Sequence, residues 1–199
     1  MLLDALWIIL SYLAGASPFG LLIARTFCGV DPRLAGSRSI GATNVSRLCG
    51  LGFGVATLVC DLLKGCLMVL GAQALGGGVF LISATALACV FGHVYSCFLG
   101  FRGGKAVATS IGVFLPLAFW QLAASCALCC LVIWGSGYVS LGSLTLLCSL
   151  PLFLIFSGLC QWLPLALILL VLVLVRHREN LARLASGTEK SWLKHRHKE

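Results

Sequence analysis

The stretch LPLALILLVLVLV at residues 163–175 contains no charged residue, and the basic tripeptide Arg176-His177-Arg178 follows it directly. Its apolar residues are continuous rather than alternating with a period of two, which favours a membrane-spanning helix over a barrel strand. Similar runs recur along the chain, so that 60% of the residues are hydrophobic and only 10% are charged. Soluble domains carry about 25% charged residues. The sequence therefore predicts an all-α integral membrane protein, a polytopic helical bundle, and excludes large soluble domains, coiled coils and disulfide scaffolds.

About seven apolar runs are predicted to cross the membrane, which takes roughly 20 residues per helix. They lie at residues 2–23, 51–75, 79–98, 107–120, 122–134, 139–156 and 163–175. Near its end the first run contains Ser17-Pro18-Phe19-Gly20, where proline is expected to kink or break the helix. A count of five spans, with some of the segments re-entrant, is the alternative. We expect residues 1–199 to form a single membrane domain.

Nearly all of the charge lies in three polar segments. The formal charge is +3 over residues 25–47, +2 over residues 93–109 and +4 over residues 176–199. Because basic segments stay on the cytoplasmic side, this pattern places the N-terminus on the outer side of the membrane. Residues 28–50 and 92–106 are then cytoplasmic motif segments, and residues 176–199 form a basic cytoplasmic tail. Anionic membrane lipid is the expected surface partner of that tail, and no nucleic-acid partner is expected.

The first polar segment combines small, hydroxylated and basic residues. Its candidates are Gly36, Ser37, Gly41, Asn44 and Arg47. Small residues let backbone N–H groups converge on an anion, while a hydroxyl and a guanidinium add directed donors. A flexible cytosolic turn is the alternative interpretation.

The second polar segment contains His93 and the run Gly103-Gly104-Lys105. Glycines followed by a lysine at the start of a helix suit a phosphate group, because bare N–H groups, the positive helix end and an ammonium coincide. The run is not a Walker A loop, because Leu99 replaces the first glycine and Ala106 the hydroxyl residue of that motif. The alternative is a plain interfacial loop.

The third polar segment begins at His177, which shares a helical face with Asn180, so both side chains are predicted to point back into the bundle. A solvated basic helix is the alternative. Ser140 is predicted to line the cytoplasmic side of a cavity or merely to pack. His195 and His197, in the last residues of the tail, are expected to be solvated.

Two further patterns receive structural interpretations. Asp61 and Lys64 are three residues apart on one helical face, and buried ionisable groups in a membrane are usually paired or functional. We interpret them as an internal ion pair that braces the bundle. Most of the eleven cysteines lie inside apolar runs, where they are small packing residues. No metal site and no cofactor are predicted.

Three ordered motifs are similar to the signature motifs of the PlsY-type acyl-phosphate:glycerol-3-phosphate acyltransferases. They lie at residues 36–44, at residues 92–109, and in the run from His177 to Glu189. The resemblance covers nearly the whole chain. Two glycines of the family's motifs are replaced here, by Arg38 in the first motif and by Ala106 in the second.

The resemblance implies transfer of a fatty acyl group from acyl phosphate to the 1-hydroxyl of glycerol-3-phosphate, giving lysophosphatidate and phosphate. It makes the enzyme that forms acyl phosphate a candidate partner. The expected catalytic residues are Ser37, Lys105, His177 and Asn180. The expected substrate-binding residues are Gly36, Gly41, Asn44, Arg47, His93, Gly103, Gly104, Ser140 and Glu189.

Acyl phosphate already carries a good leaving group, so the reaction needs no strong enzyme nucleophile. The sequence contains no His-x-x-x-x-Asp dyad, because Phe98 and Ala182 stand five residues after His93 and His177. A direct transfer aided by positioning and charge stabilisation is therefore expected. An anion transporter or channel is the competing class, and a non-catalytic lipid-binding scaffold is a third.

Cys28 and Cys49 lie in the first basic segment and test the predicted sidedness. A single-cysteine variant that keeps either residue should resist an impermeant thiol reagent in intact cells and react once the membrane is opened. The measurement is a mass-shift assay with and without permeabilisation. Labelling of intact cells would reverse the topology and place the proposed site outside.

Overall fold

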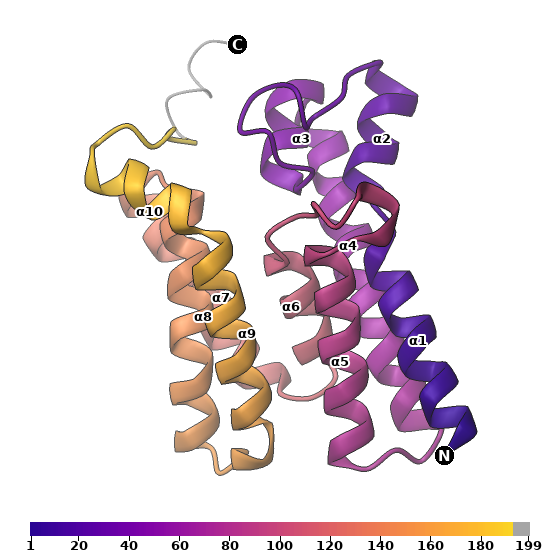
Figure 1. Ribbon diagram of the computed structural model, residues 1–199. Helices are drawn as coiled ribbons and strands as arrows, with labels where there is room; N and C mark the ends of the chain where they lie inside the picture. The colour runs from indigo at the N-terminus through magenta and orange to yellow at the C-terminus, as the bar shows by residue number, and fades with distance from the viewer. Residues whose placement is uncertain (193–199) are drawn as a thin grey trace. The chain divides into compact units, whose positions relative to one another are not determined.

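The computed structural model describes residues 1–192, which lie in two compact units with the boundary between Leu117 and Ala118 (Figure 1). His195 and His197 lie outside the described residues. The first unit contains α1 (Leu2–Ala16), α2 (Phe19–Cys28), α3 (Ala42–Cys49), α4 (Leu51–Ala74), α5 (Val79–Val94), a 3-10 turn (Cys97–Leu99) and α6 (Val107–Phe114). The second contains α7 (Phe119–Ser136), α8 (Val139–Phe156), a 3-10 turn (Cys160–Trp162), α9 (Leu163–Arg176) and α10 (Arg178–Ala185). The described residues form helices and turns without a strand.

In the first unit, α1 packs along α5 and α4 packs along α6 through pairs of glycines. Gly15 of α1 and Gly92 of α5 each lie so close to the opposite backbone that a Cβ would clash with it. Gly65 of α4 and Gly112 of α6 do the same. Lipid is as apolar as the side chains it meets, so helices in membranes associate through such close contacts rather than through hydrophobic burial.

The predicted break near Pro18 is confirmed, because α1 ends at Ala16 and α2 begins at Phe19. Proline lacks an N–H and interrupts the helical hydrogen bonds. The carbonyl of Ser17, at this break, accepts a hydrogen bond from Lys64 Nζ of α4 at 3.1 Å. The break therefore exposes a backbone acceptor that the neighbouring helix uses.

Five helical stretches of the described chain are long and apolar enough to cross a membrane, or six if one bent pair counts as a span. The five are Leu2–Cys28, Leu51–Ala74, Val79–Leu99, Phe119–Ser136 and Val139–Phe156; the pair is Cys160–Arg176 with Arg178–Ala185, bent by 59°. The count of seven is not confirmed. The fourth predicted span is shorter than expected, because α6 has 8 residues, about 12 Å, and Trp120 belongs to α7.

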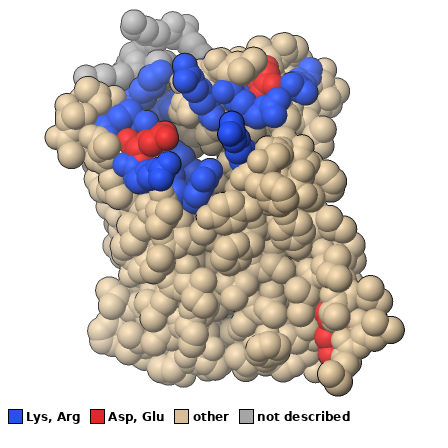
Figure 2. Space-filling model, viewed as in Figure 1, with Lys and Arg blue, Asp and Glu red and all other residues tan. Residues whose placement is uncertain are grey.

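The charged side chains lie mostly in the polar segments that the sequence indicated, in each of the two units. Figure 2 shows the Lys and Arg side chains gathered at one end of each unit, while the rest of the visible surface is almost free of charge. In the first unit this end carries the loop before α3 and the loop before α6; in the second it carries α10. The polar motifs therefore lie at the basic ends.

Candidate active site

The loop between α2 and α3 is organised around the side chain of Asn44, which is 1% exposed. Its Oδ1 accepts the Ser37 N–H at 2.8 Å. Its Nδ2 donates to the carbonyls of Pro32 and Ser39 at 2.9 and 2.8 Å. Asn44 thus closes the loop that presents Ser37, and its predicted contact with substrate remains a prediction.

Gly36 must be glycine in this loop. Its φ of +64° is one that side chains disfavour, and a Cβ there would clash with Asn44 Oδ1. Arg38, two residues on, also has a positive φ, +54°, as does Ala106 with +63°. These are the two positions at which this chain replaces a glycine of the motifs, and the left-handed backbone is the physical reason for a glycine there.

Residues 103–105, which we call the glycine turn, fold back onto His93. The N–H groups of Gly103 and Gly104 donate to the carbonyls of Val94 and His93, both at 3.0 Å. A Cβ on Gly104 would clash with His93 Nε2, and one on Gly103 with the His93 carbonyl. The expectation of bare glycine N–H groups is therefore wrong: the glycines permit close packing on His93, and the turn leads to Lys105.

The predicted pair of Asp61 and Lys64 is present, with Lys64 Nζ 2.8 Å from Asp61 Oδ1. His93 joins them, with its Nδ1 2.8 Å from Lys64 Nζ. All three side chains are at most 5% exposed. We call these residues the α4–α5 cluster. Sequence spacing does not indicate the third member, because contact between His93 and Lys64 depends on how α4 and α5 pack.

In the second unit, the carboxylate of Glu189 holds three other side chains. Its Oε1 accepts from Ser140 Oγ at 2.8 Å and from Asn180 Nδ2 at 2.6 Å, and its Oε2 accepts from Arg183 Nε at 2.6 Å. We call these four residues the Glu189 cluster. The sequence placed Ser140, Asn180 and Glu189 at the site without this connection, which joins the start of α8 to α10.

His177, between α9 and α10, is buried like Asn180, as the shared helical face predicted. Its Nδ1 lies 2.9 Å from the Val173 carbonyl. A carbonyl only accepts, so Nδ1 carries the proton, and in the neutral ring Nε2 has the lone pair. The contact with its own helix therefore fixes the orientation of the His177 ring.

Two carboxyl groups near the basic segments are held in the charged form. Hydrogen bonds from Arg33 and then from Arg25 keep the pKa of Asp31 well below its usual range. Partial burial raises the pKa of Glu189, but the hydrogen bonds within the Glu189 cluster outweigh it, so the pKa lies below its ordinary value. Both carboxylates therefore anchor cationic loops rather than take up protons at neutral pH.

The remaining predicted residues lie in these same loops. Ser37, Lys105 and Arg47 are half-buried, and Arg47 belongs to α3. Gly41 caps the start of α3, and its N–H donates to Ser39 Oγ at 3.3 Å. Within the described residues, no group of three His, Cys, Asp or Glu side chains is arranged to hold a metal ion.

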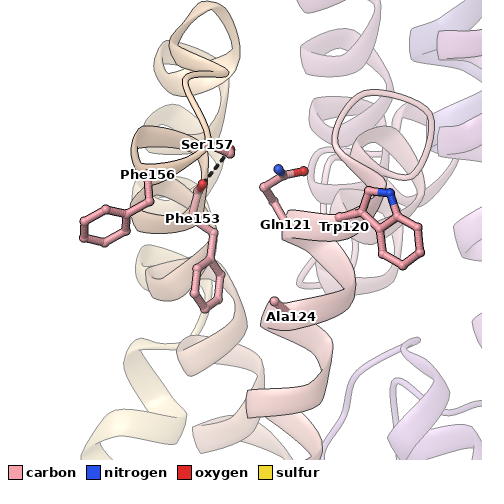
Figure 3. Close-up of a pocket in the computed structure, with 6 residues that line it drawn as sticks. All are labelled: Trp120, Gln121, Ala124, Phe153, Phe156 and Ser157. Carbon is pink, nitrogen blue, oxygen red and sulfur yellow. Dashed lines mark hydrogen bonds between the residues drawn. The ribbon is translucent and has the colours of Figure 1, made fainter.

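An apolar cavity of about 250 Å³ lies elsewhere in the second unit. It is lined by Trp120, Gln121, Ala124, Phe153, Phe156 and Ser157, and the Ser157 hydroxyl donates to the Phe153 carbonyl at 2.7 Å (Figure 3). Phe153 is about 20 Å along α8 from Ser140, so this cavity is separate from the Glu189 cluster.

The fold and the polar clusters define the class: an all-α integral membrane protein with ordered basic segments at the ends of its helices. The family model for glycerol-3-phosphate acyltransferase matches residues 5–187. The chain belongs to the glycerol-3-phosphate acyltransferase family.

Relatives and solved structures agree with this assignment. The chain is 62% identical over 197 residues to a glycerol-3-phosphate acyltransferase of Desulfovibrio desulfuricans, covering 99% of this chain and 88% of the relative. It is 51% identical over 192 residues to one of Lawsonia intracellularis, covering 96% and 97%. Crystal structures of PlsY (YgiH), an integral membrane glycerol 3-phosphate acyltransferase, match with TM-scores of 0.90 for the glycerol 3-phosphate form and 0.88 for the lysphosphatidic acid form. Their identities are 38% and 37%, and each match covers 94% of both chains.

Arg38→Gly tests whether Arg38, which replaces a glycine of the first motif, contacts the substrate. Arg38 is exposed, and glycine accepts its positive φ, so the loop should keep its shape. We expect the KM for glycerol-3-phosphate to change by less than about threefold, under 1 kcal/mol. Steady-state kinetics at fixed ionic strength measure this, with Ser37→Ala as the damaging comparison. A tenfold rise would place Arg38 against the substrate.

Glu189→Gln tests the Glu189 cluster. Glu179→Gln is the control for loss of a carboxylate, because exposed Glu179 makes a 4.0 Å surface ion pair with Arg183, and such pairs contribute little to stability. The amide at position 189 cannot hold Arg183 as a carboxylate does, so thermal stability and activity should fall, whereas the control should change neither. Because the folded pKa of Glu189 is lowered, its stabilising contribution is present at neutral pH and lost as the pH falls through that lowered value. Thermal unfolding from pH 7 to pH 3 should therefore show a smaller acid loss in Glu189→Gln than in the unchanged protein.

Proposed function

We propose that this protein transfers a fatty acyl group from acyl phosphate to the 1-hydroxyl of glycerol-3-phosphate, the acceptor named for its relatives. The supporting observation is that each of the three motifs forms an ordered, hydrogen-bonded basic segment. The glycine turn leads to Lys105, the Asn44 loop presents Ser37, and the Glu189 cluster holds Asn180. Both substrates carry phosphate, for which such segments are suited.

In the proposed reaction the hydroxyl oxygen attacks the acyl carbonyl carbon, and the bond from that carbon to the phosphate oxygen breaks. The phosphate leaves with the bonding electron pair, and the products are lysophosphatidate and inorganic phosphate. The hydroxyl proton passes to a phosphate group of the substrate, whose second pKa near 6 makes it a suitable acceptor at neutral pH. The carboxylate of Glu189 is unsuited to that task, because its pKa is lowered.

The residues have separate roles in this proposal. Lys105 and Arg47 neutralise phosphate charge, Ser37 donates to a phosphate oxygen, and Asn180 and His177 orient the glycerol. Positioning and charge stabilisation supply the rate enhancement, without a covalent acyl-enzyme. Gly36, Gly103 and Gly104 act by permitting the loop geometry.

The setting of the reaction is also proposed. The chain is a single domain of the bacterial inner membrane, with the N-terminus outside and the motifs and C-terminus in the cytoplasm. The acyl chain then stays in the lipid phase while both phosphates meet the basic ends. The enzyme that forms acyl phosphate is its proposed supplier.

The donor assay tests this function directly. Purified protein in lipid or detergent should release phosphate and form lysophosphatidate from acyl phosphate and glycerol-3-phosphate, without an added metal ion. Acyl-CoA or acyl carrier protein as the only donor should give no product. Robust turnover with acyl-CoA, or an isolable acylated serine or cysteine, would contradict the proposal.

Lys105→Ala should lower kcat/KM by roughly 10²–10³-fold, as removal of a preorganised charge-stabilising donor does. Arg102→Ala is the matched control, because it removes one positive charge from an exposed position three residues earlier. The control should keep near-normal kinetics. Equal activity of Lys105→Ala and the unchanged protein would remove the glycine turn from the site.

A further inference from the structure

The α4–α5 cluster contains three buried titratable side chains, and the proposed reaction uses none of them directly. It lies entirely within the first unit, on α4 and α5, beside the break between α1 and α2. Buried charges in a membrane are costly unless they are paired. A brace for the bundle would need only the ion pair, yet the cluster includes a histidine that touches the glycine turn.

The ammonium of Lys64 has three N–H groups, and three acceptors surround it. They are Asp61 Oδ1 at 2.8 Å, His93 Nδ1 at 2.8 Å and the Ser17 carbonyl at 3.1 Å. Because the ammonium has no lone pair, it can only donate. Asp61 pairs with the ammonium as an ion, while His93, which faces a group that only donates, must accept at Nδ1.

This contact fixes the tautomer of His93. A neutral imidazole that accepts at Nδ1 carries its proton on Nε2. His93 Nε2 is directed at Gly104, where a Cβ would clash with it. The His93 carbonyl also takes the Gly104 N–H at 3.0 Å. The ring and the backbone carbonyl of His93 thus both contact the glycine turn.

We infer that Asp61 and Lys64 are positioning residues for Lys105, acting through His93. Asp61 holds the ammonium, the ammonium holds Nδ1, and the oriented ring and carbonyl hold the glycine turn against α5. The turn then sets the place of the Lys105 ammonium. This inference rests on the proposed function only in taking Lys105 as the charge-stabilising residue.

Lys64→Met tests the inference, since it removes the ammonium and keeps most of the side-chain length. We expect kcat/KM to fall about tenfold to 100-fold, the size of effect that misplacement of a catalytic group has. Thr57→Val is the matched control: Thr57 lies about two turns before Lys64 on α4, is fully buried, and its hydroxyl donates to the carbonyl of Phe53 in its own helix. It should keep near-normal kinetics.

Two double variants separate positioning from bracing. In a Lys105→Ala background, Lys64→Met should lower kcat/KM by less than about threefold, because the group it positions is absent. Asp61→Leu combined with Lys64→Met replaces the ion pair by apolar side chains, which often restores stability. It should recover the thermal stability lost in Lys64→Met but not the rate. Losses that multiply in the first double variant, or a rate fully restored in the second, would overturn the inference.

A spectroscopic measurement decides the inference independently of activity. In protein labelled with ¹⁵N in its imidazole rings, His93 should show an unprotonated Nδ1 and a protonated Nε2, with a His93→Asn variant to assign the signals. Lys64→Met should abolish this pure tautomer. A His93 signal that is the same in Lys64→Met as in the protein without substitutions would overturn the inference. Absence of transferase activity in the protein without substitutions would contradict the proposed function alone.

Discussion

The buried ammonium of Lys64 is the interaction on which the first unit depends, because one ion pair and two hydrogen bonds join it to three parts of the chain. Its partners come from the α1–α2 break, from α4 and from α5. An ammonium left with an unmet N–H group in such surroundings is costly. Glycine pairs bring the helices close, and the ammonium adds polar contacts at defined positions along them.

The sequence predicted the helices well because hydropathy is a local property. The run at residues 139–156 and the start of α4 at Leu51 agree with the structure. Residues 107–120 did not, because apolar composition continues through the turn before α7 and hides the end of α6 at Phe114. Composition shows which residues avoid water and leaves open where the backbone changes direction.

The site could be predicted as three segments and not as a set of contacts. The i, i+3 spacing of Asp61 and Lys64 is visible in the chain, since one helix creates it. The addition of His93 needs the packing of α4 on α5, and the ties of Glu189 to Ser140 and Asn180 need α8 beside the tail. Glycines 103 and 104 were correctly singled out for the wrong reason: their close approach to His93 explains them, rather than free N–H groups.

Carboxylates are scarce in this chain, and three of the described ones serve as anchors. Asp31 holds Arg33 and Arg25, Asp61 holds Lys64, and Glu189 holds Arg183 with two neutral donors. Each carboxylate fixes a segment while cancelling little of the surrounding positive charge, because the basic residues outnumber the acidic ones by 14 to 6. Under the proposed function, this arrangement fixes the cations before a phosphate group arrives and leaves the basic segments with a net positive charge that attracts it.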